Sequence, residues 1–585
     1  MMLVVVMKEL LIIVVELDNN EAGDEGGEAI GNVDDGHGNE VLNDDNQNVN
    51  DDHGNEVLNE DNQNRLVDTP VTRQSQRILN QQHGWEVYLV TLPSSRHKEP
   101  DCIMAKQVEL DKLRSFDVFE EVPYVGQHCI STRWVLWMKG SEVRARLVAR
   151  GFEEDPGTAV DSPTVSKSSV RFVLAMTVAH HWIIKSTDIK SAFLQGMSLK
   201  RNVYLVPPKE AGAGDKVWKL KRCLYGLSDA ARQFYESVTE EMVTLGCMKS
   251  NLDPSMFYKR DENGLSGLLV SHIDDFLHSG TDSFENSTTA KLCKRFIAGS
   301  HSERSFSYVG YQLTQFSSCI VVDQNSYLDS IEVGTMAAER ELQKDEPLSS
   351  EELTEFRSLV GSLNWVVQGT RPDLAFSLVE LSTKFKNATV RDLVTVKKLV
   401  LKAKQSKTDV VFPDLGPESG WRVIGYCDAS FANLSDGVGS CMGYVVFLVG
   451  HHNKACPIAW KSGKISRVVN STEAAEALAL SEVIGESILL KKLLVSVKGS
   501  NMKSMKVTIL TDHKGVHEAL SSTKMVKNKR LRIDIAEIKE CISKGDITEV
   551  RRCTTKQQLA DCLTKKGADG RKLLAVLQSG ILPSV

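Results

Sequence analysis

The chain has 585 residues, a length that excludes a single hydrophobic core and gives room for three or four domains. Its composition, 41% apolar and 25% charged, is ordinary for a soluble globular protein. The net charge of −7 hides an asymmetry, because residues 1–64 hold seventeen acidic residues and one basic residue, Lys8. The remaining 69 basic and 60 acidic residues give residues 65–585 a net charge of +9, which suits a body that lies along a phosphate backbone. A solvated surface with a slight basic excess would give the same count.

The N-terminal run MMLVVVMKELLIIVVEL is apolar, but Lys8, Glu9 and Glu16 interrupt it. It is shorter than the ~20 apolar residues that span a bilayer, and it lacks a basic start and a small-residue cleavage site. We therefore expect no transmembrane segment and no targeting signal, with a marginal signal peptide as the alternative. The twelve cysteines are scattered without CxxC pairs or zinc-ligand spacing, which is typical of reduced core residues in an intracellular protein.

Residues 1–95 are predicted to form a disordered acidic N-terminal segment with an internal repeat. DDGHGNEVLNDDNQN from Asp34 is followed by DDHGNEVLNEDNQN from Asp51. A stretch so poor in apolar residues cannot bury enough surface to offset the loss of chain entropy. A calcium-binding loop is the alternative, although the spacing lacks the alternating ligands and distant Glu of an EF-hand.

Helical and strand-like periods alternate over residues 101–329, as in an α+β domain. The spacing predicts a helix over residues 166–182 with Ser166 as its N-cap, followed by a strand IIKSTDIKSAF. Farther on, the apolar strands GLLVSHI and FLHSG are joined at Asp274 and Asp275, which predicts a hairpin with two carboxylates at its tip.

Residues 336–420 are predicted to be mostly helical, without an acid cluster, and to form a connector. From Trp421 the sequence predicts a small α/β domain with a mixed sheet. Its expected elements, in chain order, are strands at RVIGYCDAS, GYVVFLV and CPIAW, a long helix STEAAEALALSEVIGESILLKKLL, a strand VTILTD, a short helix, a helix around RIDIAEIKECI, a strand ITEVRRC and a helix KQQLADCLTKK.

Carboxylates on buried strands need a reason, because an unpaired carboxylate is strongly disfavoured there. Asp188 lies within a predicted strand, and folding could bring it to Asp274 and Asp275. Mg²⁺ prefers a few carboxylates together with water and substrate phosphates, and two such ions can clamp the oxygens of phosphoryl transfer. A pair of Asp residues at a turn is nevertheless more often a solvated turn.

Six collinear motifs between about Ile103 and Tyr327 resemble the reverse transcriptase of copia-type LTR retrotransposons. They are STRWVLWMK, VRARLVARGFEED, STDIKSAFLQG, KLKRCLYGLSDAARQFY, HIDDFLHSG, and YVGYQL followed by DQNSY. EFRSLVGSLNWVVQGTRPDLAFSLVELSTKF resembles the connecting region of the same family, and the sequence from Asp428 onward resembles its ribonuclease H. The resemblance implies a multidomain α+β and α/β chain. A right-hand polymerase of fingers, palm and thumb would occupy residues 96–335, a helical connection 336–420 and a ribonuclease H-like mixed α/β domain 421–585.

The resemblance assigns the metal-ligating acids of the palm to Asp188 and Asp274, with Asp275 as the adjacent acid. Phe193 takes the place of the aromatic residue that crowds the sugar 2′-hydroxyl and so favours deoxynucleotides, although simple core packing would also explain it. The other implied substrate residues are Arg144 and Arg146 for triphosphate oxygens, Asp229 near the template or nucleotide, and Tyr308 and Gly310 near the primer end.

Two departures from the family pattern flank these residues. His272-Ile273 stands where many relatives have Tyr-Val, which changes what faces the primer. Ser228-Asp229 stands where many have a Gln, so a carboxylate replaces the amide at a position implied to contact the template or nucleotide. Neither change removes a metal ligand.

The resemblance also implies four metal-binding acids in the C-terminal domain: Asp428 on the first strand, Glu476 on the long helix, Asp512 at the end of VTILTD and Asp561 on the last helix. Acids from such distant elements can hold two Mg²⁺ or Mn²⁺ ions that activate water for RNA cleavage. Glu473 lies one helical turn before Glu476 and is the alternative ligand; the family's motif favours Glu476.

The implied function is RNA-directed DNA synthesis followed by ribonuclease H cleavage of RNA–DNA hybrids, with two divalent ions in each active site. The expected partners are an RNA template, a DNA primer, the hybrid and deoxynucleoside triphosphates, with a homodimer or separately encoded Gag and integrase left open. We expect a cytoplasmic location in virus-like particles, with the nucleus as the alternative. The competing hypothesis is an inactive or host-adopted remnant that binds nucleic acid or a protein; a host polymerase or nuclease fits the order of the motifs less well.

Overall fold

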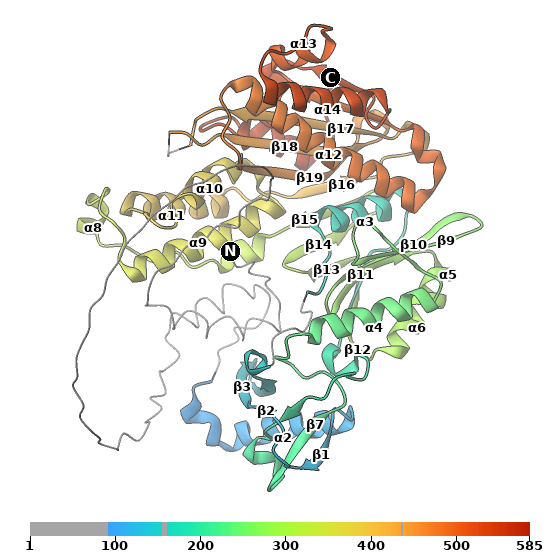
Figure 1. Ribbon diagram of the computed structural model, residues 1–585, viewed down its shortest axis with the longest axis vertical. Helices are drawn as coiled ribbons and strands as arrows, with labels where there is room; N and C mark the ends of the chain where they lie inside the picture. The colour runs from blue at the N-terminus through green and yellow to red at the C-terminus, as the bar shows by residue number, and fades with distance from the viewer. Residues whose placement is uncertain (1–91, 155–160, 435–436, 585) are drawn as a thin grey trace, which may run out of the picture. The chain divides into compact units, whose positions relative to one another are not determined.

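The protein is described by a computed structural model over residues 92–154, 161–434 and 437–584 (Figure 1). The acidic segment predicted over residues 1–95 lies outside these residues, except for its last four. There, Ser94 begins a short 3₁₀ helix, Ser94–Lys98. The described residues combine helices with five β-sheets, which confirms a mixed α/β chain.

The first described part combines one helix, one four-stranded sheet and one hairpin. Helix α2 (Pro100–Ser115) begins with a proline, whose missing N–H is not needed at that position. The hairpin sets Arg144 opposite Trp137 and Arg146 opposite Val135. The sheet has the order β1 (Phe119–Pro123), β7 (Lys216–Leu220), β6 (Tyr204–Leu205), β2 (Cys129–Ile130), and the hairpin is β3 (Thr132–Lys139) with β4 (Glu142–Ala149).

A six-stranded antiparallel sheet follows. Its order is β12 (Ala298–Glu303), β5 (Lys185–Ile189), β11 (Asp275–Gly280), β10 (Gly264–His272), β9 (Met256–Asp261), β8 (Met248–Lys249). Helix α3 (Lys167–Ala179) packs against β10 and β11, and its side-chain cap is Ser166, which accepts the N–H of Ser169 as predicted. The other helices of this part are α4 (Ala230–Thr244), α5 (Asp282–Phe284) and α6 (Ala290–Arg295).

A second four-stranded antiparallel sheet has a helical excursion between its last two strands. The sheet order is β13 (Ser305–Tyr308), β14 (Tyr311–Gln315), β15 (Cys319–Asp323), β16 (Val410–Pro413). The helices are α7 (Asn325–Ser330), α8 (Ala338–Leu342), α9 (Ser350–Gly369), α10 (Ala375–Ser382) and α11 (Val390–Gln405). The predicted helical character of residues 336–420 is confirmed, and β16 is a strand that the sequence did not predict.

The C-terminal part is built on a five-stranded sheet of order β19 (Ala455–Lys464), β18 (Cys441–Val449), β17 (Arg422–Ser430), β20 (Lys506–Thr511), β21 (Glu549–Arg552). β17, β18 and β19 are antiparallel, whereas β20 and β21 run parallel to β17. Helix α12 (Thr472–Lys498) packs its apolar side chains on β17 and β18. The remaining helices are α13 (Lys514–Ser521), α14 (Lys529–Ser543) and α15 (Arg571–Ser579). The predicted mixed sheet is therefore confirmed.

The prediction of a helix at KQQLADCLTKK is wrong. Two short 3₁₀ helices, Thr555–Gln557 and Asp561–Leu563, replace it. The Gln558 side chain donates to the carbonyl of Cys427 at 2.8 Å and accepts the N–H of Ala560 at 3.1 Å. Side chains that bind nearby backbone groups compete with helical hydrogen bonds, so Asp561 lies on a tight turn held against β17.

The strand expected at IIKSTDIKSAF is shorter than predicted. It ends at Ile189, and after Ser191, whose φ is +53°, the chain turns into a 3₁₀ helix, Ala192–Gln195. Phe193 consequently lies on a turn beside the sheet.

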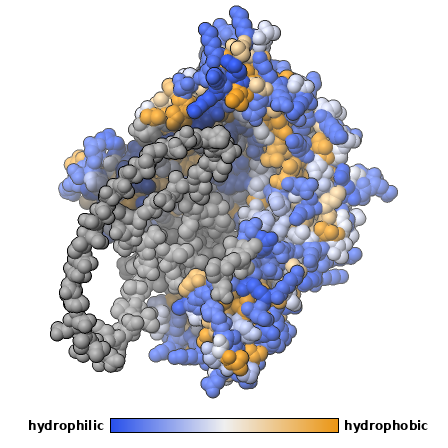
Figure 2. Space-filling view, viewed as in Figure 1, coloured by the Kyte–Doolittle hydropathy of each residue, from blue (hydrophilic) through white to orange (hydrophobic). Residues whose placement is uncertain are grey.

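Among the residues drawn in colour in Figure 2, most are hydrophilic, and hydrophobic residues are scattered between them in small groups. Scattered exposed apolar residues are normal for a folded domain. Among the described residues, helices that combine the length and the apolar character needed to cross a bilayer are absent.

Candidate metal centres

Two of the acids lie near the ends of two neighbouring parallel strands in the C-terminal sheet. The pairing of β17 with β20 ends at Tyr426 and Leu510; Asp428 lies two residues farther along β17, and Asp512 directly follows the end of β20. The turn of Asp561 lies against β17. As a result, carboxylate oxygens of Asp428, Asp512 and Asp561 all lie within 4.8 Å of one another.

Glu476 adds a fourth acid from helix α12. Its side chain is only 4% exposed, and its Oε2 atom has no hydrogen-bond partner. Burial, together with the negative charges of Asp428 and Asp512, raises the pKa of Glu476 to about 9. Glu473, the alternative ligand, is exposed. Helix α12 therefore presents Glu476, and not Glu473, to the other acids.

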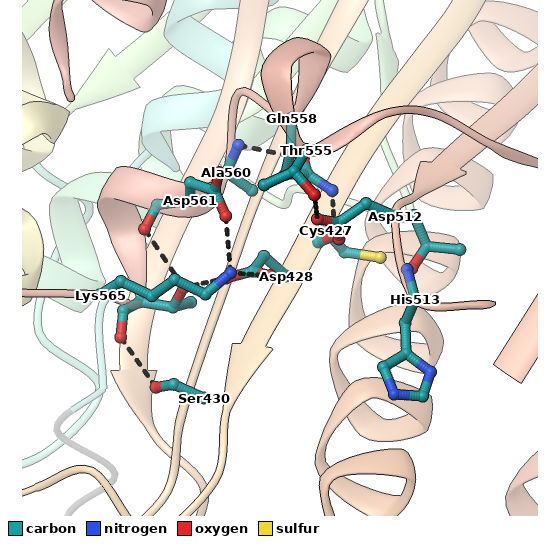
Figure 3. Close-up of polar contacts among 12 residues, drawn as sticks. Cys427, Asp428, Ser430, Asp512, His513, Thr555, Gln558, Ala560, Asp561 and Lys565 are labelled. Carbon is teal, nitrogen blue, oxygen red and sulfur yellow. Dashed lines mark hydrogen bonds and ion pairs between the residues drawn. The ribbon is translucent and has the colours of Figure 1, made fainter. Parts of the chain in front are cut away.

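Asp428 is fully buried, and burial raises its pKa to about 6 despite the nearby Lys565 ammonium. The ammonium of Lys565 donates to Asp428 Oδ1 at 2.9 Å and to Asp561 Oδ1 at 2.6 Å (Figure 3). Thr564 Oγ1 donates to the other oxygen of Asp428. These contacts supply one positive charge to a cluster of four acids.

These four acids, here called the C-terminal acid cluster, fit a divalent cation. Buried carboxylates need a counter-charge, and the unpaired Oε2 of Glu476 is an oxygen that lacks one. An all-oxygen donor set is what Mg²⁺ and Mn²⁺ prefer. The cluster can therefore hold such an ion and position it beside a phosphate group.

A second set of acids lies on the six-stranded sheet. Asp188 on β5 is the direct partner of Asp275 on β11. Asp274 precedes it at the tip of the β10–β11 hairpin, where Ile273 has a φ of +59°, and its carbonyl accepts the N–H of Ile189 at 2.9 Å. We call Asp188, Asp274 and Asp275 the hairpin acid group. The structure thus brings together three acids that are up to 87 residues apart in the sequence.

The hairpin acid group is less closely gathered than the C-terminal acid cluster. Within residues 92–154, 161–434 and 437–584, two sets of residues bring three possible ligand atoms within 4.8 Å of one another. One set is Asp428, Asp512 and Asp561, and the other is Glu99, Asp101 and Cys102. Arg96 pairs with both acids of the latter set, at 2.6 and 3.6 Å, so that set already has its counter-charge.

Gly299 lies at an irregular position of β12, directly against Asp188. A Cβ atom at this glycine would lie 2.5 Å from Asp188 Oδ2. The Asp188 carboxylate therefore lies over a backbone position that has no room for a side chain.

Two of the predicted substrate residues meet at Tyr225. The Phe193 ring lies 5.5 Å from the Tyr225 ring, and the Arg146 guanidinium lies 4.3 Å from the centre of the same ring. Phe193 and Tyr225 are both buried. Arg144 lies elsewhere on the hairpin with a half-exposed side chain, and pairs with Glu142 at 2.6 Å.

Asp229 is buried, and its carboxylate binds the guanidinium of Arg201 at 2.7 Å. Asp229 is therefore held in a structural ion pair and is not open to a substrate. Tyr308 is also buried, its hydroxyl has no hydrogen-bond partner, and burial and Asp275 raise its pKa. Gly310, with a φ of +77°, lies in the turn after it, where a Cβ would lie 2.9 Å from Trp365 Nε1.

The sequence reasoning missed Tyr225, Thr564 and Lys565. Lys565 carried a usable signal, because it stands four residues after Asp561, a spacing at which opposite charges meet on one helical face. Tyr225 had no comparable signal, since its neighbours Phe193 and Arg146 come from elements distant in sequence.

Residues 116–338 match the family described as "Reverse transcriptase (RNA-dependent DNA polymerase)". The chain is 28% identical over 460 residues to the "Retrovirus-related Pol polyprotein from transposon RE1" of Arabidopsis thaliana, covering 74% of this chain and 30% of that protein. It is 27% identical over 508 residues to the polyprotein from transposon TNT 1-94 of Nicotiana tabacum, covering 80% and 37%. A solved foamy viral protease-reverse transcriptase in complex with double-stranded DNA shares 10% identity, with a TM-score of 0.43, over 78% of this chain and 70% of that one.

The chain spans about a third of the length of these two Pol polyproteins. Through its reverse transcriptase segment it is related to the Pol polyproteins of copia-type retrotransposons, as the six motifs predicted.

Proposed function

With the chain related to retrotransposon Pol polyproteins, we propose that it is a copia-type RNA-directed DNA polymerase joined to a ribonuclease H. We assign residues 96–335 to the polymerase with its fingers, palm and thumb, 336–420 to the connection, and 421–585 to the ribonuclease H. The proposed partners are an RNA template, a DNA primer, their hybrid and deoxynucleoside triphosphates. The net charge of +9 over residues 65–585 supports binding to phosphate backbones, so affinity for nucleic acid should fall steeply with salt.

In the proposed polymerase reaction the primer 3′-hydroxyl attacks the α-phosphate of the incoming nucleotide, and pyrophosphate leaves. Asp188 and Asp274 would hold divalent ions, with Asp275 beside them on β11. When bound, such ions lower the pKa of the attacking hydroxyl or water and stabilise the charge that develops on the phosphate oxygens. Phe193 would limit the room at the sugar 2′ position. Arg146 would contact triphosphate oxygens through charge-assisted hydrogen bonds.

In the proposed ribonuclease H reaction water attacks a phosphate of the RNA strand, and the 3′-oxygen leaves. The four acids of the C-terminal acid cluster would hold Mg²⁺ or Mn²⁺ at the strand. Asp428 lies within β17 and is paired with Gly443 on β18, so its carboxylate needs little reorganisation on binding. Recognition should use phosphates and groove shape, because none of these groups reads base identity.

One observation carries this proposal. The buried Glu476 has an unpaired carboxylate oxygen, and it faces two further carboxylates. Burying a set of like charges without a cation is strongly unfavourable, and a purely structural site would replace them with apolar residues. A site that gathers four acids and leaves one oxygen open is best explained by cation binding.

The experiment compares Glu476→Gln with Glu473→Gln, a matched change one helical turn away at an exposed position. Purified full-length protein is assayed for cleavage of an RNA–DNA hybrid and for primer extension on RNA, with Mg²⁺ or with EDTA. We expect Glu476→Gln to lose hybrid cleavage at least about a hundredfold and to keep extension, whereas Glu473→Gln keeps both. Equal cleavage by the two variants would contradict the assignment. Nucleic-acid binding by a wild-type protein that lacks both activities would favour the remnant hypothesis.

A further inference from the structure

Lys565 is the cation nearest to the C-terminal acid cluster. Its ammonium bridges Asp428 Oδ1, at 2.9 Å, and Asp561 Oδ1, at 2.6 Å, and so joins two elements that are 133 residues apart in the chain. In Figure 3 the Lys565 side chain extends between the two aspartates. It therefore lies where the cluster concentrates its negative charge.

We propose that Lys565 is a tethered cation that fills the acid cluster until a divalent ion displaces it, and thereby sets the affinity of the cluster for metal. The inference rests on the proposed function, which assigns these acids to metal binding. It concerns a residue outside the four acids.

The first argument is that the lysine and a divalent ion need the same oxygens. Both oxygens of Asp428 already have a donor, because Thr564 binds one and Lys565 the other. Asp428 has no exposed surface through which an ion could reach an unused lone pair from solvent. An ion bound by Asp428 and Asp561 therefore competes with the ammonium for both acids.

The second argument is that, of the two donors to Asp428, Lys565 is the one able to leave. Its side chain is 41% exposed, whereas Thr564 is fully buried. A lysine ammonium sits on a flexible four-carbon stem, so it can move into water without displacing the backbone. A bound ion brings two charges to the acids in place of one, which favours the exchange.

The third argument is that the cluster needs a cation when no metal is present. Asp428, Asp512 and Asp561 come from separate elements, their carboxylates repel one another when ionised, and Asp428 is buried. The ammonium holds Asp428 and Asp561 together at hydrogen-bond distance. Lys565 thus stabilises the metal-free protein and opposes metal binding at the same time.

The test measures Mn²⁺ binding by titration calorimetry on the full chain. The hairpin acid group is silenced by Asp188→Asn and Asp274→Asn in every sample, and adding Glu476→Gln to this background identifies which part of the remaining heat comes from the C-terminal acid cluster. Lys565→Gln is compared with Lys566→Gln, which removes the same charge from the next residue, whose ammonium lies 3.7 Å from Glu380. We expect Lys565→Gln to bind Mn²⁺ about tenfold more tightly, and Lys566→Gln to bind as the parent does.

Thermal unfolding in EDTA provides a second readout that does not depend on activity. Lys565→Gln should unfold at a lower temperature than Lys566→Gln without metal, and the difference should vanish at saturating Mn²⁺. Lys565→Met keeps the aliphatic stem and should repeat both results if the Gln variant folds poorly. Lys565→Arg keeps the charge and should bind Mn²⁺ as weakly as the parent.

The outcomes separate this inference from the proposed function. Equal or weaker Mn²⁺ binding by Lys565→Gln and Lys565→Met would overturn the tethered-cation role, provided that Glu476→Gln abolishes the binding. Absence of Mn²⁺ binding at the cluster in both the parent and the Lys565 variants would instead overturn the proposed ribonuclease H site, and this inference with it.

Discussion

Asp188 and Asp275 are direct partners on neighbouring antiparallel strands, β5 and β11. Directly paired residues have Cβ atoms about 5 Å apart on the same face of a sheet, so this pairing brings two acidic side chains close together. This placement makes the pair the first target for mutation.

Asp188→Asn should abolish primer extension on an RNA template, with a loss of at least about a hundredfold, because an amide is a poor ligand for a divalent ion. Asp274→Asn should have the same effect. The measurement is nucleotide incorporation with Mg²⁺ or Mn²⁺. Asp261→Asn, an exposed position at the end of β9, is the control and should retain full extension. Robust extension by Asp274→Asn would exclude our assignment of the polymerase site.

Gly299→Ala should reduce extension about tenfold or more, because the added methyl group would meet Asp188 Oδ2 at 2.5 Å and push the carboxylate aside. Hybrid cleavage should stay within about twofold of wild type, since no acid of the other site is touched. Gly361→Ala on helix α9 is a matched control, because a Cβ atom there meets nothing within 4 Å. Unchanged extension by Gly299→Ala would show that the position of Asp188 is not critical.

Without metal, the protein should become less stable as the pH rises from about 5 to about 9. An unfolded glutamate has an ordinary pKa of 4.5, whereas the folded pKa of Glu476 is about 9. Over this window the unfolded chain gives up a proton that the folded chain keeps, so rising pH favours unfolding. Asp428, with a pKa of about 6, acts in the same direction at the acidic end.

Glu476→Gln tests this linkage, because it removes the titrating group and keeps the shape. In EDTA the unfolding temperature of the variant should depend less on pH and should exceed that of wild type at pH 8. Adding Mn²⁺ should raise the wild-type value more than that of the variant. Glu473→Gln should behave as wild type, and a pH dependence shared by all three proteins would argue against Glu476 as its source.

Phe193→Ala should increase the incorporation of ribonucleotides relative to deoxynucleotides by about tenfold or more, if the ring crowds the sugar. The comparison is kcat/KM for matched nucleotides in the same preparation, so a general loss of stability cancels. Phe193 is buried against Tyr225, and an equal loss with both nucleotides would indicate a packing role alone.

The sequence predicted most of the scaffold because its signals were local. Ser166 as an N-cap, the β10–β11 hairpin and the long helix that carries Glu476 each depend on residues close together in the chain. Two boundaries failed, and at one of them a contact distant in sequence overrode local preference. Gln558 reaches the backbone of Cys427, 131 residues away, and converts the expected last helix into short turns.

The sequence predicted which acids belong to the candidate sites, but not which side chains bind those acids. Motif order alone indicated which acids to expect, and Asp428, Asp512 and Asp561 do lie together. The contacts of Lys565 with Asp428 and of Arg201 with Asp229 could not be read from spacing, because each joins elements that only the folded chain brings together. A charged side chain in the sequence does not reveal which of several acids it will neutralise.

The pairing of β17 with β18 has a consequence for how the C-terminal site tolerates change. Asp428 lies inside β17 as the direct partner of Gly443 on β18, so its position is set by main-chain hydrogen bonds rather than by the side chains beneath it. Exchanges among the apolar residues of these strands can therefore accumulate without moving Asp428. The insertion of a single residue before Asp428 within β17 would turn its side chain to the opposite face of the sheet and dismantle the site in one step.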